Sequence, residues 1–592
     1  MNNLRYYLKP FKSKLVIGFV LILIFSSISA YIPLFEGEYI IGHIYKNPPK
    51  IEEYDKNMRY FFHFLSINLL LYFICTIVKF IYNKLLITSI HSAIKNIRTE
   101  MQRKIHKLSI QYFDQNTVGN VMSRMTQDIE VVANGLQQSL AALIASFFNI
   151  LMLVVLMFWV NWRLGMVVCL LIPMSLVTIF IINRKSRSVF IERFEKSGEY
   201  NGFLQEKYTG HKEILLYNQQ KHMIEEFQKL NNDLSNTIFK SNFLSGLTVP
   251  IVNSFTYIIL LIMLILGIVL TKQLLPQMLY KLGFVTIQTG IFQAFIQYVW
   301  RLGNPINDLS QIFVILQSTK AAANRIFNFL SETEETETEG TITPFALNKL
   351  QGHVVFSNVS FYYYKNQWII KDMNLEVQPQ QTVAIVGSTG SGKTTLINLL
   401  SRFYEIQQGS IIIDGIDIKK ISRNNLRSIL GIVFQDVWLF KGTILDNLRY
   451  GNHNKTHEQI IAAAQKTKIH DLIMAKKDQY QTVISDELDN LSQGEKQLIT
   501  ITRTLLHDPS ILILDEATST IDIRMEKILQ QSIQKLLKQK TAFVIAHRLS
   551  TIVNADLIVV LQNGVIVEQG KHQDLIKKKG FYYKLYTSQF QK

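Results

Sequence analysis

Cysteine is nearly absent from this chain, which holds only Cys75 and Cys169 among its 592 residues. Both lie inside apolar runs, where a thiol packs as a small hydrophobic side chain. Two isolated cysteines of this kind indicate neither a disulfide framework nor a metal site.

Long apolar runs are missing from the second half of the chain. Before about residue 305 such runs are long enough to cross a bilayer, and after it none is. The chain is also too long for one ordinary domain. We therefore expect a helical membrane domain at residues 1–330, a linker at 331–348 and a second domain at 349–592.

Acidic residues are scarce relative to basic ones, with 45 Asp and Glu against 62 Lys and Arg, which gives a net charge of +17. Such a balance can indicate nucleic-acid binding. Here the basic residues cluster between the apolar runs, which is the pattern of a membrane protein that faces anionic lipid. We predict membrane lipid as a partner and no nucleic acid.

The apolar runs predict six membrane spans, with long and basic loops after the second and the fourth. By the positive-inside rule these loops and both termini are cytoplasmic, and the protein is a multi-pass protein of the cytoplasmic membrane. With no transit peptide in the sequence, a bacterial membrane is favoured. The spans are expected at about 15–35, 60–82, 140–160, 164–183, 247–270 and 281–302.

Residues 1–30 allow a second interpretation, because basic residues precede an apolar run that ends in Ser29-Ala30, as in a secretory signal peptide. The run continues to Phe35, which is long for the apolar core of a signal, so a retained span is favoured. In the first basic loop, apolar residues at helical spacing predict that the spans continue as helices beyond the bilayer. Thr117–Asn120 and Thr209-Gly210 are the predicted breaks.

The second half contains a complete phosphate-binding loop, Gly387-Ser388-Thr389-Gly390-Ser391-Gly392-Lys393-Thr394. Glycines let consecutive backbone N–H groups wrap the phosphates, Lys393 reaches the β- and γ-phosphates, and the Thr394 hydroxyl ligates Mg²⁺. A buried-strand pattern at 383–386 precedes the loop, and a helical pattern follows it from Thr395. The spacing and its context predict that the chain binds ATP or GTP.

From about residue 349, strand and helix patterns alternate, which predicts an α/β domain. Four strand ends carry chemically active side chains, and such ends form the ligand site of an open α/β sheet. They are marked by Gly387, Gln435, Asp515-Glu516 and His547. A strand ending in Asp-Glu supplies one carboxylate for Mg²⁺ and a second to orient the attacking water. Residues 331–346, rich in glutamate and threonine, are expected to be a solvated linker.

The segment Leu491-Ser492-Gln493-Gly494-Glu495 makes a family resemblance specific. The chain resembles a half-transporter of the ATP-binding-cassette exporter superfamily, whose motifs it carries in order from the aromatic loop to His547. The membrane half resembles the same family over virtually its whole length. The matching segments there are Phe113-Asp114 with Gly119, Ser123-Arg124 and Asp128; Glu206 with Gly210; Arg301-Leu302; and Ala322 to Phe327.

The resemblance implies a role for each matched residue. Tyr363 stacks on adenine, although Tyr362 is one residue away, and Gln435 and Asp515 join Thr394 at Mg²⁺. Glu516 acts as general base and His547 contacts the γ-phosphate. Ser492 and Gly494 bind the ATP held by the opposite subunit. The remaining nucleotide contacts are assigned to Ser388, Thr389, Gly390, Ser391, Gly392, Lys393, Thr395 and Asp522.

One membrane domain and one ATPase domain make half of such a machine, so the resemblance implies a dimer. Complete hydrolytic residues permit a homodimer. The signature, however, has Gln493 and Glu495 where the family commonly has glycine and glutamine, and residues 483–488 lack the usual glycines. These departures resemble the catalytically complete subunit of bacterial heterodimeric multidrug exporters, so a heterodimer is favoured.

The resemblance favours ATP-driven export of hydrophobic or amphipathic compounds by alternating access. A peptide exporter and a non-transport ATP-gated regulator are the alternatives, and an importer is disfavoured. The sequence does not identify the substrate. Two features of the spans stay open between packing and lining a transport path: Lys79, and a polar stripe in the last span made of Thr286, Thr289, Gln293, Gln297, Arg301 and Asn304.

Overall fold

The computed structural model describes residues 2–41, 54–271, 289–335, 350–365, 367–484, 490–515, 523–545 and 552–590. The chain folds into two compact units. The first, the membrane unit, comprises residues 1–106 and 117–332, and the second, the ATPase unit, comprises residues 107–116 and 333–592.

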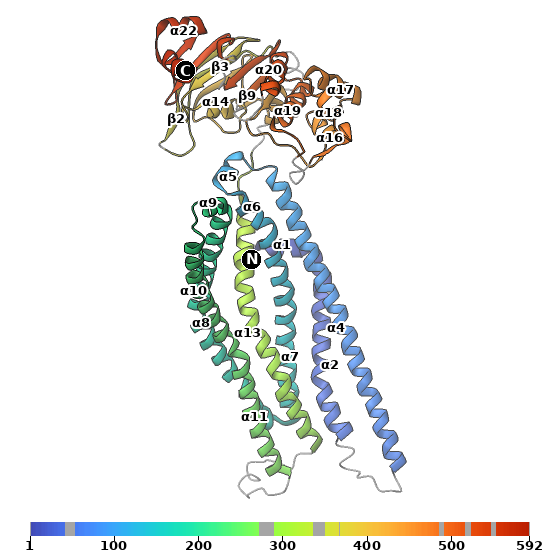
Figure 1. Cartoon of the computed structure of the whole chain (residues 1–592). Helices are drawn as coiled ribbons and strands as arrows, with labels where there is room; N and C mark the ends of the chain where they lie inside the picture. The colour runs from blue at the N-terminus through green and yellow to red at the C-terminus, as the bar shows by residue number, and fades with distance from the viewer. Residues whose placement is uncertain are drawn as a thin grey trace. The chain divides into compact units, whose positions relative to one another are not determined.

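In its described residues the membrane unit is helical, as Figure 1 shows. Its helices are α1 (Asn2–Leu8), η1 (Lys9–Phe11), α2 (Lys12–Phe35), the π-helix η2 (Glu36–Ile41), α4 (Tyr54–Ile105), α6 (Val118–Ser123), the π-helix η4 (Arg124–Asp128), α7 (Ile129–Cys169), α8 (Leu171–Thr209), α9 (His211–Leu216), α10 (Gln220–Gly246), α11 (Thr248–Thr271) and α13 (Thr289–Ser331).

Several of these helices are longer than a bilayer requires. With 52 residues, α4 extends about 78 Å, against about 30 Å for the hydrocarbon core. Four continuous helical stretches within the described residues are long and apolar enough to cross a membrane: Leu4–Ile41, Met58–Ile105, Val118–Thr209 and Gln220–Leu266. Of the last predicted span, 281–302, only the part from Thr289 lies in the described residues, at the start of α13.

Asn161 interrupts α7 between the predicted spans 140–160 and 164–183. Its backbone leaves the helical region, with φ −157° and ψ 101°, and its side-chain carbonyl accepts the backbone N–H of Leu164 at 3.2 Å. Asn161 thus interrupts the helix and caps the one that follows it. At the predicted break Thr117–Asn120, the Thr117 hydroxyl likewise caps α6 by accepting the N–H of Asn120.

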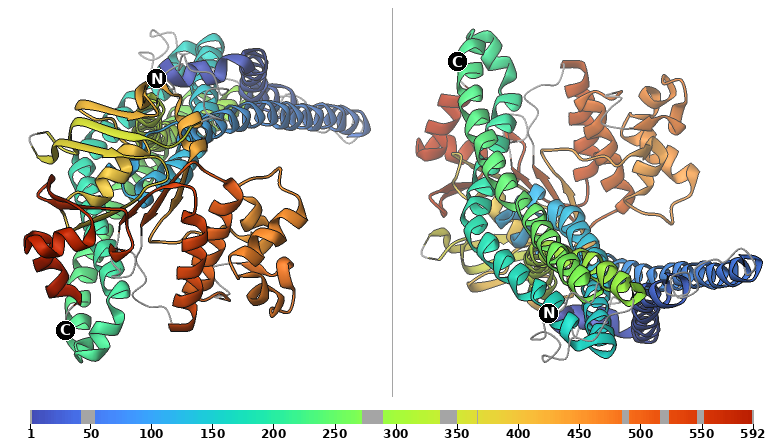
Figure 2. Two further views of the ribbon diagram at one scale, coloured as in Figure 1. Left: turned by 90° about the horizontal axis from the view of Figure 1, so that it is seen from above. Right: turned by 90° about the horizontal axis from the view of Figure 1, so that it is seen from below.

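The long helices pack in pairs. α13 lies along α7, α2 lies along α4 (both blue in Figure 1), and α8 runs beside α10 (both green in Figure 1). Figure 2 shows the same bundle from above and from below. An ion pair fastens α13 to the start of α7, because the Arg325 guanidinium contacts the buried Asp128 carboxylate at 2.5 and 2.8 Å. Both residues lie in segments that match the family resemblance, but their pairing was not predicted from the sequence.

The ATPase unit is built on two main sheets. A sheet in the order β12-β11-β3-β10-β9-β6 is parallel except for β12, and a smaller antiparallel sheet has the order β2-β1-β4-β5. The strands are β1 (Val354–Tyr362), β2 (Trp368–Val377), β3 (Thr382–Gly387), β4 (Gln408–Ile413), β5 (Ile416–Asp417), β6 (Leu430–Val433), β9 (Ile511–Asp515), β10 (Thr541–Ile545), β11 (Leu557–Gln562) and β12 (Val565–Gly570); β7 (Gly442–Thr443) pairs with β8 (Val483–Ile484) apart from them.

Helices connect and cover these strands. They are α14 (Lys393–Leu400), η6 (Ile418–Lys420), α15 (Arg423–Ile429), α16 (Ile444–Arg449), α17 (His457–Lys466), α18 (His470–Met474), η7 (Gln479–Gln481), α19 (Gln493–His507), α20 (Ile523–Leu537), α22 (His572–Lys578) and α23 (Phe581–Phe590). Along β3, Val383 and Ile385 join the apolar core beneath α14, whereas Ala384 and Val386 join the core beneath α19 and α20. Successive side chains of β3 point to opposite faces of the sheet, and each face packs into its own apolar core.

The short helix α5 (Ile110–Gln115) belongs to the ATPase unit although it lies within the membrane half of the sequence. Ile110 packs against the core beneath α14, and the Asp114 carboxylate accepts the phenol hydroxyl of Tyr404. Burial and, after it, the Asp114 carboxylate raise the pKa of Tyr404, so the phenol remains a donor. The segment is held by apolar contact and by hydrogen bonding together.

The start of the expected linker is anchored in the same unit. The backbone N–H of Glu335 donates to the carbonyl of Lys107 at 2.7 Å, and the Glu335 carboxylate lies 3.4 Å from both Arg423 and Arg427. Glu334 pairs with Lys107 at 3.3 Å. The expectation of a solvated linker is therefore wrong at Glu335, whose side chain is only 17% exposed beside two arginines, whereas Glu334 stays exposed as expected. Residues 336–349 lie outside the described residues.

Candidate functional site

The phosphate-binding loop joins the end of β3 to the start of α14. Gly390 and Gly392 adopt φ values of 80° and 103°, in the left-handed region that favours glycine. Ser388, Thr389 and Gly390 are exposed, so the loop is open on one side. Because α14 begins at Lys393, its free backbone N–H groups and its positive dipole end lie at the loop.

Two glycines of the loop are also required by close packing. A Cβ on Gly387 would stand 2.3 Å from the carbonyl oxygen of Leu561, and one on Gly392 would stand 2.8 Å from the Ile370 side chain. Substitution at either position would push the loop away from β11 or β2. The backbone is thus kept close to the sheet edge, where the phosphates of a nucleotide would lie.

Lys393 points back over the loop. Its ammonium group donates to the carbonyl oxygens of Gly387 at 2.8 Å and Ser388 at 2.9 Å. Burial lowers the pKa of Lys393, while the nearby Asp515 charge acts in the opposite direction. The ammonium group is therefore held at the loop by bonds that phosphate oxygens could replace.

The predicted strand ends meet at one edge of the main sheet. Asp515 ends β9 and stands opposite Ile545 of β10, which in turn is the neighbour of β3. Gln435 follows β6, the strand on the other side of β9, and its side chain is exposed. Glu516, Asp522 and His547, which were also predicted here, lie outside the described residues.

The residues at this edge fit a nucleotide with Mg²⁺. The Thr394 side chain is exposed, and together with the Gln435 amide and the Asp515 carboxylate it offers the oxygen ligands that Mg²⁺ prefers. The Ser391 hydroxyl is buried and has no hydrogen-bond partner in the described part of the chain. A bound group at the loop could satisfy it. Thr395, in contrast, is turned inward and its hydroxyl accepts from Tyr363.

The aromatic residue predicted to stack on adenine lies partly inside the fold. The Tyr363 ring meets Phe361 and Tyr404 edge to face, with centroids 4.8 and 4.9 Å away. Its hydroxyl donates to Thr395 at 3.2 Å. The neighbouring Tyr362 meets Trp368 in the same manner, whereas Tyr364 is 62% exposed. Stacking by Tyr363 stays a prediction, and Tyr364 is the ring most open to solvent.

The signature segment starts α19, which packs on the face of the sheet opposite α14. The exposed Ser492 caps this helix: its hydroxyl accepts the N–H of Glu495, whose carboxylate accepts the N–H of Ser492 at 2.8 Å. Glu495 also pairs with Lys476 at 3.1 Å, a contact that the sequence did not reveal. Among the described hydrogen bonds, none joins Ser492 or Gly494 to the phosphate-binding loop of the same chain.

A second polar site lies in the membrane unit and is called the polar cluster, made of Ser29, Glu36, Asn68, Tyr72, Gln297 and Arg301. The Glu36 carboxylate accepts from Asn68 and Tyr72 at 3.0 Å and from Gln297 at 2.7 Å. Arg301 donates to the Ser29 carbonyl at 2.6 Å and to the Tyr72 hydroxyl at 3.3 Å. The cluster joins α2, η2, α4 and α13.

The polar cluster was only half visible in the sequence. Gln297 and Arg301 belong to the predicted polar stripe of the last span, and both bond to other helices, as one of its two interpretations required. Glu36, Asn68 and Tyr72 were missed. An acidic residue directly after an apolar run of some twenty residues was the available signal, because such a carboxylate needs partners.

Comparison with known proteins gives two family matches. The model of the ABC transporter transmembrane region matches residues 15–295, and the ABC transporter model matches residues 370–519. A fatty acid ABC transporter ATP-binding/permease protein of Mycobacterium bovis is 36% identical over 524 residues, which cover 88% of this chain and 80% of that protein. An ATP-dependent lipid A-core flippase of Syntrophus aciditrophicus is 32% identical over 501 residues, or 84% of this chain and 80% of its own.

A solved structure of a bacterial Atm1-family ABC exporter with ATP bound has the same fold. Its TM-score is 0.77, at 23% sequence identity, and the match covers 98% of each chain. The predicted fold class, a helical membrane domain followed by an α/β nucleotide-binding domain, is thereby confirmed.

Proposed function

This chain belongs to the ABC transporter family, whose ATPase domains drive transport, and we propose that it exports amphipathic, lipid-like compounds across the cytoplasmic membrane by alternating access. The observation that carries the proposal is the open phosphate-binding loop at the start of α14, with Asp515 and Gln435 after two further strands of the same parallel sheet. The chain is a multi-pass membrane protein, and the same chain carries the nucleotide site.

ATP is the proposed nucleotide, and Mg²⁺ its metal. Thr394, Gln435 and Asp515 would hold Mg²⁺, which supplies charge neutralisation at the phosphates when bound. Glu516 is the proposed general base, and His547 the proposed γ-phosphate contact. In the sequence His547 comes after β10, the neighbour of β3, and Glu516 comes directly after β9, the neighbour of β10. Lys393 would exchange its bonds to loop carbonyls for bonds to phosphate oxygens.

A dimer of two half-transporters is proposed because the signature and the loop lie on helices that cover opposite faces of one sheet. Ser492 and Gly494 would complete the ATP site of the partner subunit. The Gln493 and Glu495 substitutions favour a heterodimer, in which this chain supplies the catalytic glutamate. Purification from the native membrane through a tag on this chain tests the point: a second half-transporter in the complex supports it, and a complex of this chain alone contradicts it.

The coupling of ATPase and membrane units is supported by α5. This segment stems from the membrane half of the sequence, yet Ile110 packs in the ATPase core and Asp114 accepts from Tyr404. Movement of the ATPase unit would therefore pull directly on the chain that continues into α4 and α6. Such a linkage between two states is the requirement of alternating access.

The proposed substrate class rests on two observations. Relatives at 36% and 32% identity are named for fatty acid and lipid A-core, both amphipathic. The polar cluster supplies charged and amide groups within an otherwise apolar bundle, as an amphipathic compound requires. We also propose that both termini are cytoplasmic, since the basic loops favour that orientation.

Replacement of the proposed base tests the ATPase assignment. Glu516→Gln should lower the ATPase rate of the reconstituted complex by about 10²–10³-fold while ATP binding persists, because the change removes proton acceptance and little else. The matched control is Glu526→Gln, the same substitution ten positions further along the chain, within α20. Near-full ATPase activity of the Glu516→Gln complex would contradict the assignment of Glu516 as general base, or would show that another subunit hydrolyses the ATP.

A further inference from the structure

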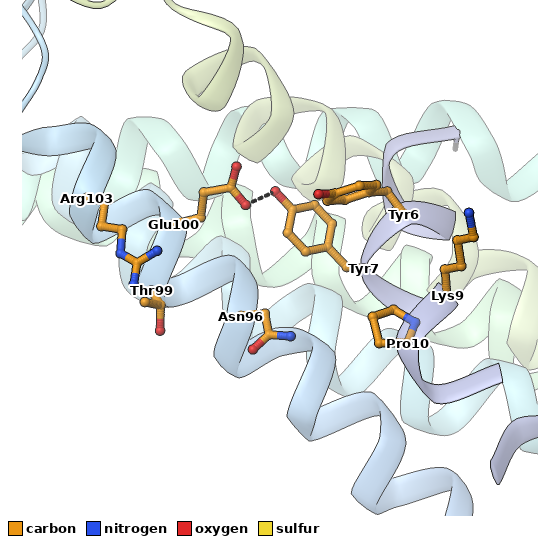
Figure 3. Close-up of a pocket in the computed structure, with 8 residues that line it drawn as sticks. All are labelled: Tyr6, Tyr7, Lys9, Pro10, Asn96, Thr99, Glu100 and Arg103. Carbon is orange, nitrogen blue, oxygen red and sulfur yellow. Dashed lines mark hydrogen bonds between the residues drawn. The ribbon is translucent and has the colours of Figure 1, made fainter. Parts of the chain in front are cut away.

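A pocket of about 860 Å³ lies between the amino-terminal helices and α4, and Figure 3 shows its lining. We name it the amino-terminal pocket. Its lining side chains include Tyr6, Tyr7 and Lys9 from α1 and η1, and Asn96, Glu100 and Arg103 from α4. Neither the nucleotide site nor the polar cluster uses any of these residues.

Tyr7 fixes the two walls of the pocket. It is 8% exposed, its hydroxyl donates to the Glu100 carboxylate at 2.5 Å, and its ring stacks on Phe327 of α13 at 6.1 Å. Figure 3 shows this bond bridging α1 and α4. Burial and the Glu100 carboxylate raise the pKa of Tyr7, so the hydroxyl keeps its proton and occupies one oxygen of Glu100.

Besides the second oxygen of Glu100 and the hydroxyls of Tyr6 and Thr99, the lining holds two cations. Lys9 and Arg103 are exposed, and neither has an ion-pair or hydrogen-bond partner among the residues that the structure describes. Asn96 adds a neutral amide on the same face of α4, since positions 96, 100 and 103 are spaced by one helical turn. Two cations against the single Glu100 carboxylate leave the lining with a net positive charge, and with the Asn96 amide they fit an anion with several oxygens, such as a phosphate.

The depth of the pocket relative to the bilayer follows from helix pairing. Ile22 of α2 packs with Tyr82 and Leu86 of α4, so in this antiparallel pair residue 10 stands near residue 96. Five residues separate position 10 from the predicted start of the span at 15, which is about 8 Å along a helix. That distance corresponds to the headgroup layer of a membrane.

The membrane side of the pocket continues into apolar surface. Val16, Ile17 and Val20 of α2 are each about half exposed, directly after the basic residues that follow Pro10. Acyl chains could lie along these side chains while a headgroup occupies the pocket. A soluble phosphate would gain nothing from this surface.

We propose that the amino-terminal pocket binds the phosphate of an anionic phospholipid, held by Lys9, Arg103 and Asn96. The inference rests on the proposed cytoplasmic position of the amino terminus, but not on the identity of the exported compound. The bound lipid would link η1 to α4 beside Tyr7, and through the stacking of Tyr7 on Phe327 it would also stabilise the position of α13. A phospholipid bound in this pocket would therefore be a structural component of the active transporter.

The test uses the full complex in nanodiscs of phosphatidylcholine mixed with phosphatidylglycerol, followed by mild extraction and native mass spectrometry. The paired change Lys9→Gln and Arg103→Gln should lower the affinity for phosphatidylglycerol about 30-fold, since each cation near an anionic lipid contributes about a fivefold factor. The matched control is Lys95→Gln with Arg98→Gln, which removes the same charge from exposed positions of α4 outside the pocket.

Equal retention of phosphatidylglycerol by the wild type and the paired variant would overturn the proposal, as would an equal loss in the control. Glycerol 1-phosphate added to phosphatidylcholine nanodiscs distinguishes the source: thermal stabilisation that requires Lys9 and Arg103 would assign the pocket to a soluble phosphate and overturn the lipid. All arms are repeated in the Glu516→Gln background, so failure of lipid binding is read separately from failure of ATP turnover.

Discussion

The phosphate-binding loop of the ATPase unit is built from consecutive residues, 387–394, whereas the polar cluster of the membrane unit joins residues as far apart as Ser29 and Arg301, 272 positions away. The loop is held by backbone conformation and by glycines that nothing larger can replace. The cluster is held by side chains that satisfy one another inside an apolar bundle. A site made locally tolerates movement of its surroundings, and a site made from distant helices depends on their arrangement.

This difference has a functional consequence. Because the loop belongs to one strand–helix connection, it can keep its geometry through a transport cycle. The polar cluster spans α2, η2, α4 and α13, so any relative movement of these helices must break or rebuild its bonds. In the proposed cycle the loop is the constant element and the cluster is the element that changes.

The largest expected effect comes from the loop. Lys393→Ala removes the cation that the loop carbonyls hold and should reduce ATPase activity by about 10²–10³-fold, because charge at the phosphates is left uncompensated. Lys420→Ala, at an exposed position of η6, is the control and should leave the rate unchanged. Measured turnover of Lys393→Ala within a fewfold of wild type would contradict the assigned role.

The next largest effect tests the polar cluster. Glu36→Ala leaves the donors of Asn68, Tyr72 and Gln297 without their acceptor and should lower the free energy of unfolding by about 3 kcal/mol. Chemical unfolding in lipid nanodiscs measures this loss. The exposed Glu38→Ala, two residues along in η2, provides the comparison. If both variants unfold alike, the hydrogen bonds of Glu36 contribute nothing and the cluster is not a structural centre.

A smaller effect is expected at the ion pair that links α13 to the start of α7. Arg325→Ala strands the buried Asp128 carboxylate and should cost about 2 kcal/mol of stability, less than a fully buried pair because Arg325 itself is half exposed. Thermal unfolding of Lys320→Ala, an exposed residue of α13, gives the baseline. An equal loss of stability in both variants would show that the effect comes from removing a positive charge from α13 and not from breaking the Asp128–Arg325 ion pair.

The smallest effect concerns the capping box of α16. Thr443→Ala should cost about 1 kcal/mol in the ATPase unit, and Thr443→Ser should restore most of it. The Thr443 side chain and backbone N–H lower the pKa of Asp446, so this contribution is complete above the usual carboxylate pKa near 4 and is lost as the pH falls through the lower pKa of the folded state. A stability difference that grows on acidification would have the wrong sign.

The same contrast explains what sequence could predict. The fold class and the loop followed from local patterns: apolar runs, a glycine spacing, and strands that end in polar residues. The pairing of Asp128 with Arg325, the partners of Glu36 and the anchoring of Glu335 by Arg423 and Arg427 depend on which distant helices meet. Spacing along the chain carries no record of such contacts, and charged residues in a linker pattern look solvated until the structure supplies their partners.

Glu495 and Tyr363 mark a second limit. Glu495 was recognised in the sequence as a departure from the common signature. Its hydrogen bond to the backbone N–H of Ser492 and its ion pair with Lys476 became visible only in the structure. Tyr363 is one of four consecutive aromatic residues, 361–364. The sequence pattern could not show which of these rings packs against Phe361 in the core. Glu516, Asp522 and His547 remain predictions from sequence.

The central claim is that ATP hydrolysis at this phosphate-binding loop drives export. It is tested most directly by ATP-dependent accumulation of a fluorescent fatty-acid analogue or a fluorescent phospholipid in inside-out proteoliposomes that contain the native complex. The account predicts accumulation that requires Mg²⁺ and ATP and disappears in both Lys393→Ala and Glu516→Gln, while Lys420→Ala accumulates normally. Accumulation that persists in the Lys393→Ala and Glu516→Gln variants, or ATP turnover with no accumulation of either amphiphile, would contradict it.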